Sequence, residues 1–390
     1  MKKVKTLAAL TFAATLLSGA ALAQGKPDIL IGHVAINSGP AGTYGRTQFV
    51  MVQLAAEDIN KAGGINGSMI KVETADSEFN PAKASLRLRE FQSKGAFGVV
   101  GPMSGGEWET AAPLANQIKM PAITVNASKP GITVRPWTLR LGPTDAVMAV
   151  GAMEEMKKKF PNAKRIAIMA DIRQASGVSA VEIQQEAAKK FGFEIIEVLE
   201  FSTATTDVSP LAIKVKNLKP DFILVNAVIP QALALAKEFV TQGVTTPVLA
   251  NSFIWPGGWV GAVGDAGKTW YTWGWLTNSK LADGNQALYD TVVPRYIVGA
   301  TKDPTNGPPN VANAANAYDA VLLIASILKR KGIDGNTPPE KAREALKDGF
   351  METTQFSGLL NHKISPEGDS VQQVRLLQPD LANKVWKFAD

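Results

Sequence analysis

Apolar runs and amphipathic segments alternate regularly along the first part of the chain. Residues 28–32 form an apolar run typical of a buried strand, and residues 46–61 carry apolar side chains three or four positions apart, as in an amphipathic helix. The alternation continues with predicted strands at 69–75, 97–101 and 121–125 and predicted helices at 82–93 and 110–118. Alternating strands and helices form parallel sheets covered by helices on both faces, so this part predicts an α/β lobe.

A second alternation begins after residues 135–145, which contain Pro136, Gly142 and Pro143. Its predicted strands are 165–170, 194–198, 222–225 and 247–249, and its predicted helices are 146–160, 179–191, 210–218 and 231–240. Two long helices, 286–298 and 312–331, and a β-like tail, 356–390, complete the pattern. The chain therefore predicts two doubly wound lobes, with a third portion that must return to one of them.

The first 23 residues have the pattern of a secretory signal peptide. A basic start precedes the apolar stretch 7–17, which is too short to span a bilayer, and the small-x-small site Ala21-Leu22-Ala23 follows. The alternative is an apolar N-terminal helix. We expect cleavage after Ala23 and an exported, periplasmic protein. The segment holds three lysines and no acid, so the formal charge falls from +6 to +3, which gives no reason to expect a nucleic-acid partner.

Composition narrows the function classes. With 45% hydrophobic and 19% charged residues in 390, the chain is neither disordered nor a coiled coil. It contains no cysteine, which excludes disulfides, thiolate metal sites and a cysteine nucleophile. Beyond the N-terminus no segment reaches about 18 uninterrupted apolar residues, so we expect no membrane anchor.

Motifs for catalysis are lacking. The two histidines, His33 and His362, have no metal-ligand companions in the sequence, and no metalloprotease, phosphate-loop or nucleophile-elbow motif can be read. We therefore expect a non-enzyme without cofactor or metal. His33 either reaches a cleft or is a hydrogen-bonded structural residue. A hydrolase that uses carboxylates alone, such as Asp76 and Glu107, stays open as an alternative.

The stretch 56–67, Ala-Glu-Asp-Ile-Asn-Lys-Ala-Gly-Gly-Ile-Asn-Gly, resembles the signature of type I periplasmic solute-binding proteins of ABC transporters, in the Leu/Ile/Val-binding branch. Further matches follow in order and cover nearly all of the mature chain: Ser38-Gly39-Pro40, Tyr44-Gly45, Val100-Gly101-Pro102, Ile123-Thr124, residues 165–168 and Pro220-Asp221-Phe222.

The resemblance implies a type I periplasmic binding protein fold, in which a hinge of three crossings joins two lobes. It implies a first lobe of 26–144 plus 276–355 and a second of 145–275 plus 356–390, with crossings near Pro143-Thr144, Trp273-Gly274 and Gln355-Phe356. The ligand enters the open cleft, and closure buries it. The closed form then docks on an ABC permease in the inner membrane. We expect a monomer.

The segment from Gly101 to Trp108 runs from a strand end to a helix start. Backbone N–H groups and the helix dipole make such a segment an anion site. The resemblance implies that Ser104, Gly105, Gly106 and Glu107 hold the ligand carboxylate there. A carboxylate beside an anion site repels it, so Glu107 either points to solvent or receives a donor from the ligand. The alternative is a glycine-rich connection without a special role.

Three more first-lobe positions enter through the resemblance. It implies that Ser128, in the segment Asn126-Ala127-Ser128 after the fourth strand, hydrogen-bonds the ligand. It also implies that Tyr44, after the first strand, packs on the ligand. Taken alone, Ser128 or Tyr44 would more often be an ordinary loop or core residue than a ligand contact.

The second lobe departs from the leucine-binding pattern. The resemblance implies a tyrosine and a glutamate that hold the ligand ammonium, but this chain has Val228 and Ser252 there, and Ala175 at a third tyrosine position. Burying an ammonium without an anionic partner costs several kcal/mol. We therefore predict a carboxylate ligand with an apolar or aromatic body instead of an α-amino acid.

Neighbouring residues complete the predicted second-lobe site. Asn226 and Phe253 flank the departures, and Arg173 either supplies a charge for a second polar end of the ligand or is a solvated surface residue. The first expectation for the ligand is an aromatic or phenylpropanoid acid, and the runner-up is a branched-chain or other aliphatic amino acid. A soluble ligand-sensing regulator is the alternative of another class. The aromatic residues of 270–275 either form a ligand cage or fill both faces of a strand.

Overall fold

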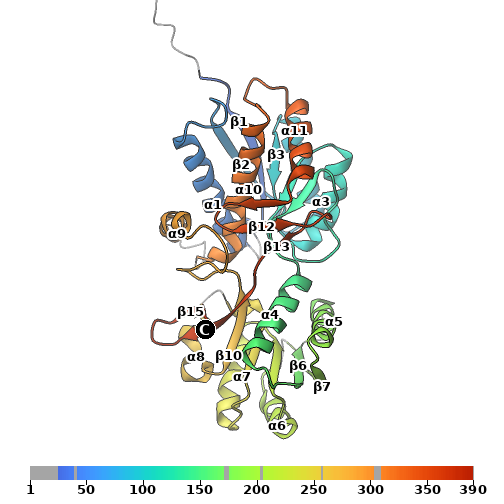
Figure 1. Cartoon of the computed structure of the whole chain (residues 1–390), viewed down its shortest axis with the longest axis vertical. Helices are drawn as coiled ribbons and strands as arrows, with labels where there is room; N and C mark the ends of the chain where they lie inside the picture. Colours follow the sequence, from blue (N-terminus) through green and yellow to red (C-terminus); the bar gives the residue numbers. More distant parts are fainter. Residues whose placement is uncertain are drawn as a thin grey trace, which may run out of the picture.

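The computed structural model describes residues 25–38, 42–170, 175–202, 205–255, 258–302 and 309–389. The predicted signal peptide and Arg173 lie outside the described residues, as do the side chains of Tyr44, Ala175 and Phe253. The chain forms two lobes, one above the other along the longest axis (Figure 1).

The first lobe is built on a five-stranded sheet of order β2-β1-β3-β4-β5, in which every pair is parallel. Its strands are β1 (Ile29–Ala35), β2 (Ile70–Asp76), β3 (Gly98–Val100), β4 (Ala122–Thr124) and β5 (Thr138–Arg140). Its helices are α1 (Gly42–Lys61), α2 (Pro81–Ser93), α3 (Gly105–Gln117), α9 (Gln286–Thr301), α10 (Val311–Arg330) and α11 (Pro339–Glu352).

Alternating side chains of these strands enter two different cores. Val100 and Ile123 pack with α1, α10 and α11, whereas their neighbours Val99 and Ala122 pack with α2 and α3. Successive side chains of a strand point to opposite faces, so an apolar run with both faces buried needs a helix layer on each.

The second lobe is built on a seven-stranded sheet of order β15-β14-β10-β9-β8-β6-β7. Its strands are β6 (Arg165–Ala170), β7 (Glu194–Glu200), β8 (Phe222–Asn226), β9 (Val248–Ala250), β10 (Trp270–Gly274), β14 (Arg375–Asp380) and β15 (Val385–Phe388). Its helices are α4 (Asp145–Lys159), α5 (Ala175–Lys190), α6 (Ser209–Leu218), α7 (Ile229–Thr241) and α8 (Trp259–Val263), with short 3-10 turns η1 (Ser252–Ile254) and η2 (Gly264–Gly267). Within the described residues of this sheet, β14 pairs antiparallel with β10 and with β15, and the other pairs are parallel.

The predicted α/β architecture with two doubly wound lobes is confirmed, and most elements lie within a few residues of their predicted bounds. Three local predictions fail. Helix α3 begins at Gly105 instead of 110, and neither β5 nor α11 was expected. The residues of α3 before 110 include two glycines and a glutamate, which carry no apolar periodicity.

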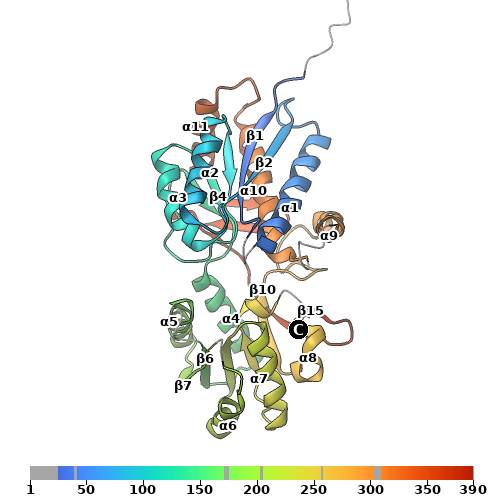
Figure 2. The same ribbon diagram turned by 180° about the vertical axis from the view of Figure 1, so that it is seen from behind.

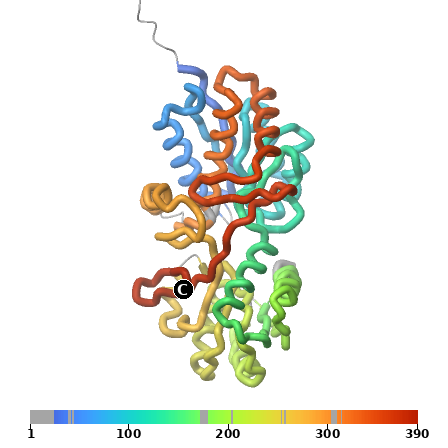
Figure 3. Tube along the Cα trace, viewed as in Figure 1, coloured from blue at the N-terminus to red at the C-terminus, as the bar shows by residue number. Residues whose placement is uncertain are grey.

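The third crossing differs from the predicted one at Gln355-Phe356. Strands β11 (Gln355–Ser357), β12 (Asn361–Ile364) and β13 (Ser370–Val371) form a small sheet that stays on the first lobe. The backbone N–H groups of Leu359 and Leu360 donate to Asp319 of α10, at 2.6 and 2.9 Å. The chain crosses only after β13, and β14 then pairs with β10 (Figure 3). Residues 356–371 therefore belong to the first lobe, because a buried carboxylate on α10 holds them there.

Candidate functional site

The carboxyl ends of the strands in both sheets face the gap between the lobes. At the end of β4, the carbonyl oxygen of Ser128 accepts a hydrogen bond of 2.9 Å from the N–H of Asp145, the first residue of the second-lobe helix α4. In the second sheet, β10 runs parallel to β9 and leads directly to Leu276, where the chain re-enters the first lobe. The chain passes between the lobes at this level of the molecule (Figure 2). In doubly wound sheets, ligands bind at these strand ends.

Gly101 allows the sharp turn that follows β3. Its φ is +97°, and a side-chain Cβ there would lie 2.2 Å from the carbonyl oxygen of Val34. No residue with a side chain fits that contact. The turn brings Ser104 to the N-cap of α3, where its hydroxyl oxygen accepts a hydrogen bond from the N–H of Glu107 at 3.3 Å.

Glu107 returns this interaction and completes a capping box. Its Oε2 accepts a hydrogen bond from the Ser104 hydroxyl at 2.7 Å, and the Ser104 N–H contributes a longer one at 3.4 Å. The side chain is 1% exposed, so the suggestion that Glu107 points to solvent is wrong. Its other oxygen, Oε1, is buried without a hydrogen-bond partner in the described part of the chain.

The capping box changes which donors remain at the start of α3. The Ser104 hydroxyl is committed to Glu107, whereas Gly105 is half-buried and Gly106 is exposed. The first N–H groups of a helix have no partner within the helix. The donors that remain at this end are therefore the backbone N–H groups of Gly105 and Gly106, beside the buried Glu107 side chain.

The predicted residues after β4 lie at the hinge. Ser128 is half-buried, and its side chain hydrogen-bonds the carboxylate of Asp145. Burial raises the pKa of Asp145, while the Ser128 hydrogen bond and the charge of Arg140 act in the opposite direction. Asn126, also half-buried, stands two residues earlier on the same strand end. Ser128 thus links the first lobe to the start of the first crossing.

On the second lobe, three predicted residues follow neighbouring strands. Asn226 ends β8, and its amide forms a reciprocal pair of 2.9 Å hydrogen bonds with Gln184 of α5. Val228 is the N-cap of α7 and is 40% exposed, and Ser252, half-buried, opens η1 after β9. None of these three positions offers an acidic group to the gap.

The tryptophans of β10 belong to the core. Trp270 packs with Trp259 at a ring distance of 5.4 Å, and Trp273 lies in the core on the other face of the sheet. The expectation that these aromatic residues fill both faces of a strand is confirmed.

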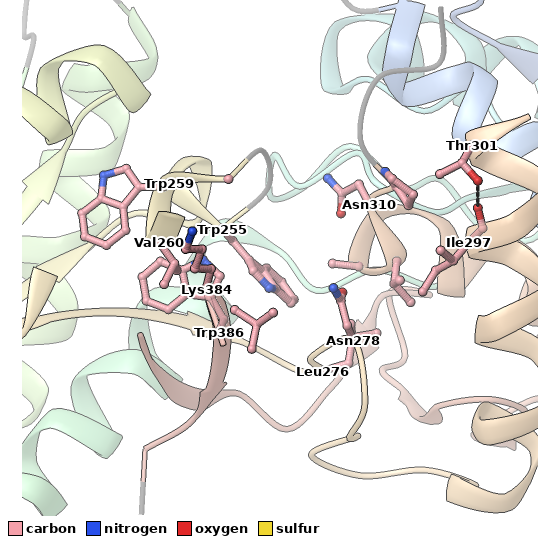
Figure 4. Close-up of a pocket in the computed structure, with 15 residues that line it drawn as sticks. Trp255, Trp259, Val260, Leu276, Asn278, Ile297, Thr301, Asn310, Lys384 and Trp386 are labelled. Carbon is pink, nitrogen blue, oxygen red and sulfur yellow. Dashed lines mark hydrogen bonds between the residues drawn. The ribbon is translucent and has the colours of Figure 1, made fainter. Parts of the chain in front are cut away.

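Sequence reasoning missed a cavity between the lobes. It has a volume of about 300 Å³ and is lined by Trp255, Trp259 and Trp386 from the second lobe and by Leu276, Asn278 and Asn310 from the first (Figure 4). We call it the tryptophan cavity. None of the predicted ligand-binding residues lines it. The one available signal was the density of tryptophan in residues 255–275.

The sequence also gave no prediction of a buried Ser–His–Asp array. His362 lies 2.9 Å from Asp319 through Nε2 and 3.0 Å from the Ser370 hydroxyl through Nδ1. The Gln372 amide then reaches Asn316 at 2.8 Å. All five side chains are buried, with exposed fractions of 0–5%. A nucleophile must meet its substrate, so this buried array acts as a framework beside the third crossing.

The remaining polar candidates are also held by the fold. His33 is fully buried, and its Nδ1 lies 3.1 Å from the Thr74 hydroxyl. Burial lowers its pKa to about 4, so it is a neutral structural residue at pH 7. Asp76 accepts hydrogen bonds from the N–H groups of Asn37 and Glu78, at 2.9 and 2.8 Å.

The described residues hold neither a cluster of metal ligands nor a membrane-spanning helix. They contain no group of three or more histidine and acidic side chains placed to hold a metal ion. No helix among them is long and apolar enough to cross a bilayer.

A family model described as periplasmic binding protein matches residues 28–382 of the chain. The chain belongs to the periplasmic binding protein family. It is a substrate-binding protein of the kind that serves ABC transporters, with the type I fold. The match covers both lobes and all three crossings between them.

Individual relatives agree with this family membership. The Leu/Ile/Val-binding protein BraC3 of Rhizobium johnstonii is 26% identical over 349 residues, which are 87% of this chain and 89% of the relative. The isoleucine complex of the branched-chain amino acid binding protein LivJ from Streptococcus pneumoniae has a TM-score of 0.72 at 22% identity, covering 93% of this chain and 99% of that one. A solute-binding protein of R. palustris, in complex with 4-hydroxybenzoate, has a TM-score of 0.71 at 19% identity and covers 93% and 96%. At such identities the structural likeness concerns the fold.

Proposed function

We propose that this periplasmic binding protein captures a small carboxylate with an aromatic body between its lobes and delivers it to an ABC permease in the inner membrane. In this proposal the first 23 residues direct export and are removed, and the mature protein works in the periplasm as a monomer without catalytic activity. The observation that carries the proposal is the contrast between the two sides of the gap. One side offers backbone donors to an anion, and the other offers no acid to a cation.

The first-lobe side supports a carboxylate. The N–H groups of Gly105 and Gly106 begin α3, a helix of 13 residues, and no side chain covers Gly106. The positive end of the helix dipole favours a negative group there. In the closed state, Ser128 and Asn126 would add hydrogen bonds from the end of β4. The buried charge of Glu107 weakens this anion site, which limits the ligand to one carboxylate at this end.

The second-lobe side supports an uncharged body. Val228 presents an apolar surface, Ser252 is a neutral hydroxyl, and the Asn226 amide is already paired with Gln184. A ligand ammonium placed against these groups would lose water without gaining a counter-ion, at a cost of several kcal/mol. A phenyl or phenol ring meets no such penalty. The 4-hydroxybenzoate complex of the R. palustris neighbour is an example of such a ligand on this fold.

A branched-chain amino acid is the second candidate. The relatives from Rhizobium johnstonii and Pseudomonas aeruginosa are named for leucine, isoleucine and valine, and the match extends over 87% and 90% of this chain. Under this reading, Glu107 would be the acid that receives the ligand ammonium, through its unpartnered Oε1.

A ligand screen by thermal unfolding separates the two candidates. Purified mature protein is heated with benzoate, 4-hydroxybenzoate, phenylpropanoate, leucine, isoleucine or valine. At 100 times its dissociation constant, a ligand adds about 2.7 kcal/mol to the free energy of unfolding. We expect the aromatic acids to stabilise the protein and the amino acids to leave it unchanged. Stabilisation by leucine but by no aromatic acid would refute the proposal.

Two substitutions and one control variant locate the binding. A Cβ at Gly106 would meet no atom within 4 Å, so Gly106→Val should fold normally while its side chain covers the N–H groups of the anion site. We expect it to lose carboxylate binding, and Thr110→Val, one turn further along the exposed side of α3, to keep it. Ser252→Glu supplies an acid on the second-lobe side, where a hydrogen bond to a charged group contributes about 1.5–3 kcal/mol. It should create leucine binding. If Gly106→Val leaves the affinity for the carboxylate unchanged, the anion site lies elsewhere.

A further inference from the structure

The tryptophan cavity lies between the lobes, close to the second crossing. Its second-lobe wall comes from α8, the residues that follow η1, and the turn between β14 and β15. Its first-lobe wall comes from the end of α9, the start of α10 and the crossing residue Leu276. At about 300 Å³ it is at the small end of the range of ligand pockets. A compound with a single ring matches that size.

Aromatic rings form the second-lobe wall. Trp259 stacks on Trp386 with a centroid distance of 5.4 Å and an interplanar angle of 11°, and Trp255 meets Trp275 edge to face at 5.5 Å. Trp259 and Trp386 are buried, while Trp255 is half-buried. These rings are held by core packing, so they present a rigid apolar surface that loses little entropy on binding.

Lys384 adds a positive charge to this wall. It occupies the turn between β14 and β15 with a φ of +56°, and its Cδ lies 3.7 Å from the position of a Cβ on Gly261 of α8. The stem therefore lies along α8, and Figure 4 shows the side chain beside Trp386 and Trp255 at the cavity. Of the described residues that line the cavity, Lys384 alone carries a charge.

The first-lobe wall is polar at its edge. Asn278 is exposed, and Asn310 and Thr301 lie near it (Figure 4). The Thr301 hydroxyl donates to the carbonyl of Ile297 at 2.9 Å, so its oxygen remains an acceptor. A ligand with a ring and two polar ends can therefore meet Lys384 on one lobe and amide or hydroxyl groups on the other.

We propose that the tryptophan cavity is a second ligand site, which takes a planar single-ring carboxylate and bridges the two lobes. The carboxylate pairs with Lys384, the ring lies against Trp255, and a hydroxyl on the far side of the ring reaches Asn278. This site goes beyond the proposed function, because it shares no residue with the anion site at Gly105 and Gly106.

The test uses the mature protein with 4-hydroxybenzoate as the probe and cyclohexanecarboxylate as the non-planar comparison. Binding of each is measured by calorimetry and by tryptophan fluorescence at low ionic strength. Lys384→Asn removes the charge but suits the left-handed turn, because asparagine tolerates positive φ. Lys384→Arg keeps the charge, and Lys387→Met removes a neighbouring exposed lysine of β15 that does not line the cavity. Each variant is also made with Gly106→Val, which leaves only the cavity available.

In the Gly106→Val background we expect one equivalent of 4-hydroxybenzoate to bind and to quench tryptophan fluorescence. Lys384→Asn should weaken this binding at least tenfold, while Lys384→Arg and Lys387→Met stay within about threefold. Cyclohexanecarboxylate should bind at least threefold more weakly than the aromatic acid. If Gly106→Val alone abolishes 4-hydroxybenzoate binding, or if Lys384→Asn leaves the affinity unchanged, the second site is overturned. Either result leaves the proposed function intact. Binding that depends on Lys384 but not on Gly106 supports the second site and contradicts the proposed anion site.

Discussion

The two sides of the gap are held by different kinds of interaction. On the first lobe, charged and polar side chains are buried and paired: Glu107 caps α3, and Asp319 binds His362 and two backbone N–H groups. On the second lobe, Val228 after β8 is 40% exposed, Asn226 and Gln184 form a neutral pair, and tryptophan rings line the tryptophan cavity. Buried polar networks fix the direction of each donor and acceptor, whereas a packed apolar wall fixes a shape without directing any polar group. Under the proposed function, the first lobe would therefore orient the ligand carboxylate and the second lobe would select the ligand body.

The largest expected effect tests the first-lobe framework. Asp319→Ala leaves His362 and the N–H groups of Leu359 and Leu360 buried without their acceptor, so we expect a loss of about 3–5 kcal/mol in the free energy of unfolding. Denaturant unfolding followed by circular dichroism measures it. In the second lobe, the matched change Asn226→Ala should cost about 1 kcal/mol, because that neutral pair is partly exposed. If Asp319→Ala and Asn226→Ala lower the free energy of unfolding equally, the two lobes do not differ in this way.

Acid should weaken the first lobe through His33, which is fully buried in its sheet. The pKa of His33 is lowered from 6.5 to about 4 by burial, so the unfolded chain takes up this proton at a higher pH than the folded one. Stability is therefore complete above pH 6.5 and is lost as the pH falls towards 4, by about 3 kcal/mol. His33→Gln should lack this part of the pH dependence in urea unfolding.

Hydrogen exchange locates the same effect. Between pH 7 and pH 4.5, amides of β1 and β3 should lose more protection than those of β6 and β8. If His33→Gln unfolds with the same pH dependence as the parent protein, groups other than His33 cause the acid sensitivity. The same holds if amides of both lobes lose equal exchange protection.

The smallest effect concerns the charge beside the anion site. Glu107→Gln keeps the capping box, because glutamine serves as well as glutamate at that position. It removes the repulsion between Glu107 and a bound carboxylate, so affinity for the ligand acid should rise about tenfold. Calorimetry against the acid found in the screen measures this. Weaker binding in the variant would instead make Glu107 a direct acceptor for a ligand donor, as the amino acid candidate requires.

Much of the fold could be predicted because its signals are local. The glycines within residues 56–67, together with Asn66, predict the end of α1. Asn66 takes a φ of +49°, as such a turn requires. The partner of that turn is not local: the Asn66 amide donates to the carbonyl of Ile333, beyond α10, at 2.8 Å. The sequence identified the turn but gave no indication that it holds a helix end 267 residues away.

The site could be predicted only in part, for the same reason. Spacing placed Ser104 to Glu107 at a helix start, but the direction of the Glu107 side chain depends on the geometry of the cap. The sequence also gave no sign that Lys384 and Asn278 line one cavity, because they come from opposite lobes and lie on either side of the third crossing.

The sequence by itself determined the order of strands and helices, the two-lobe α/β class and the family signature, because hydrophobic periodicity and turn residues act over a few positions. The tertiary structure alone decided the third crossing, the partners of Glu107 and Asp319, and the walls of the tryptophan cavity. These depend on which distant segments meet, and a buried group such as Asp319 takes whichever donors the packing brings within hydrogen-bond distance.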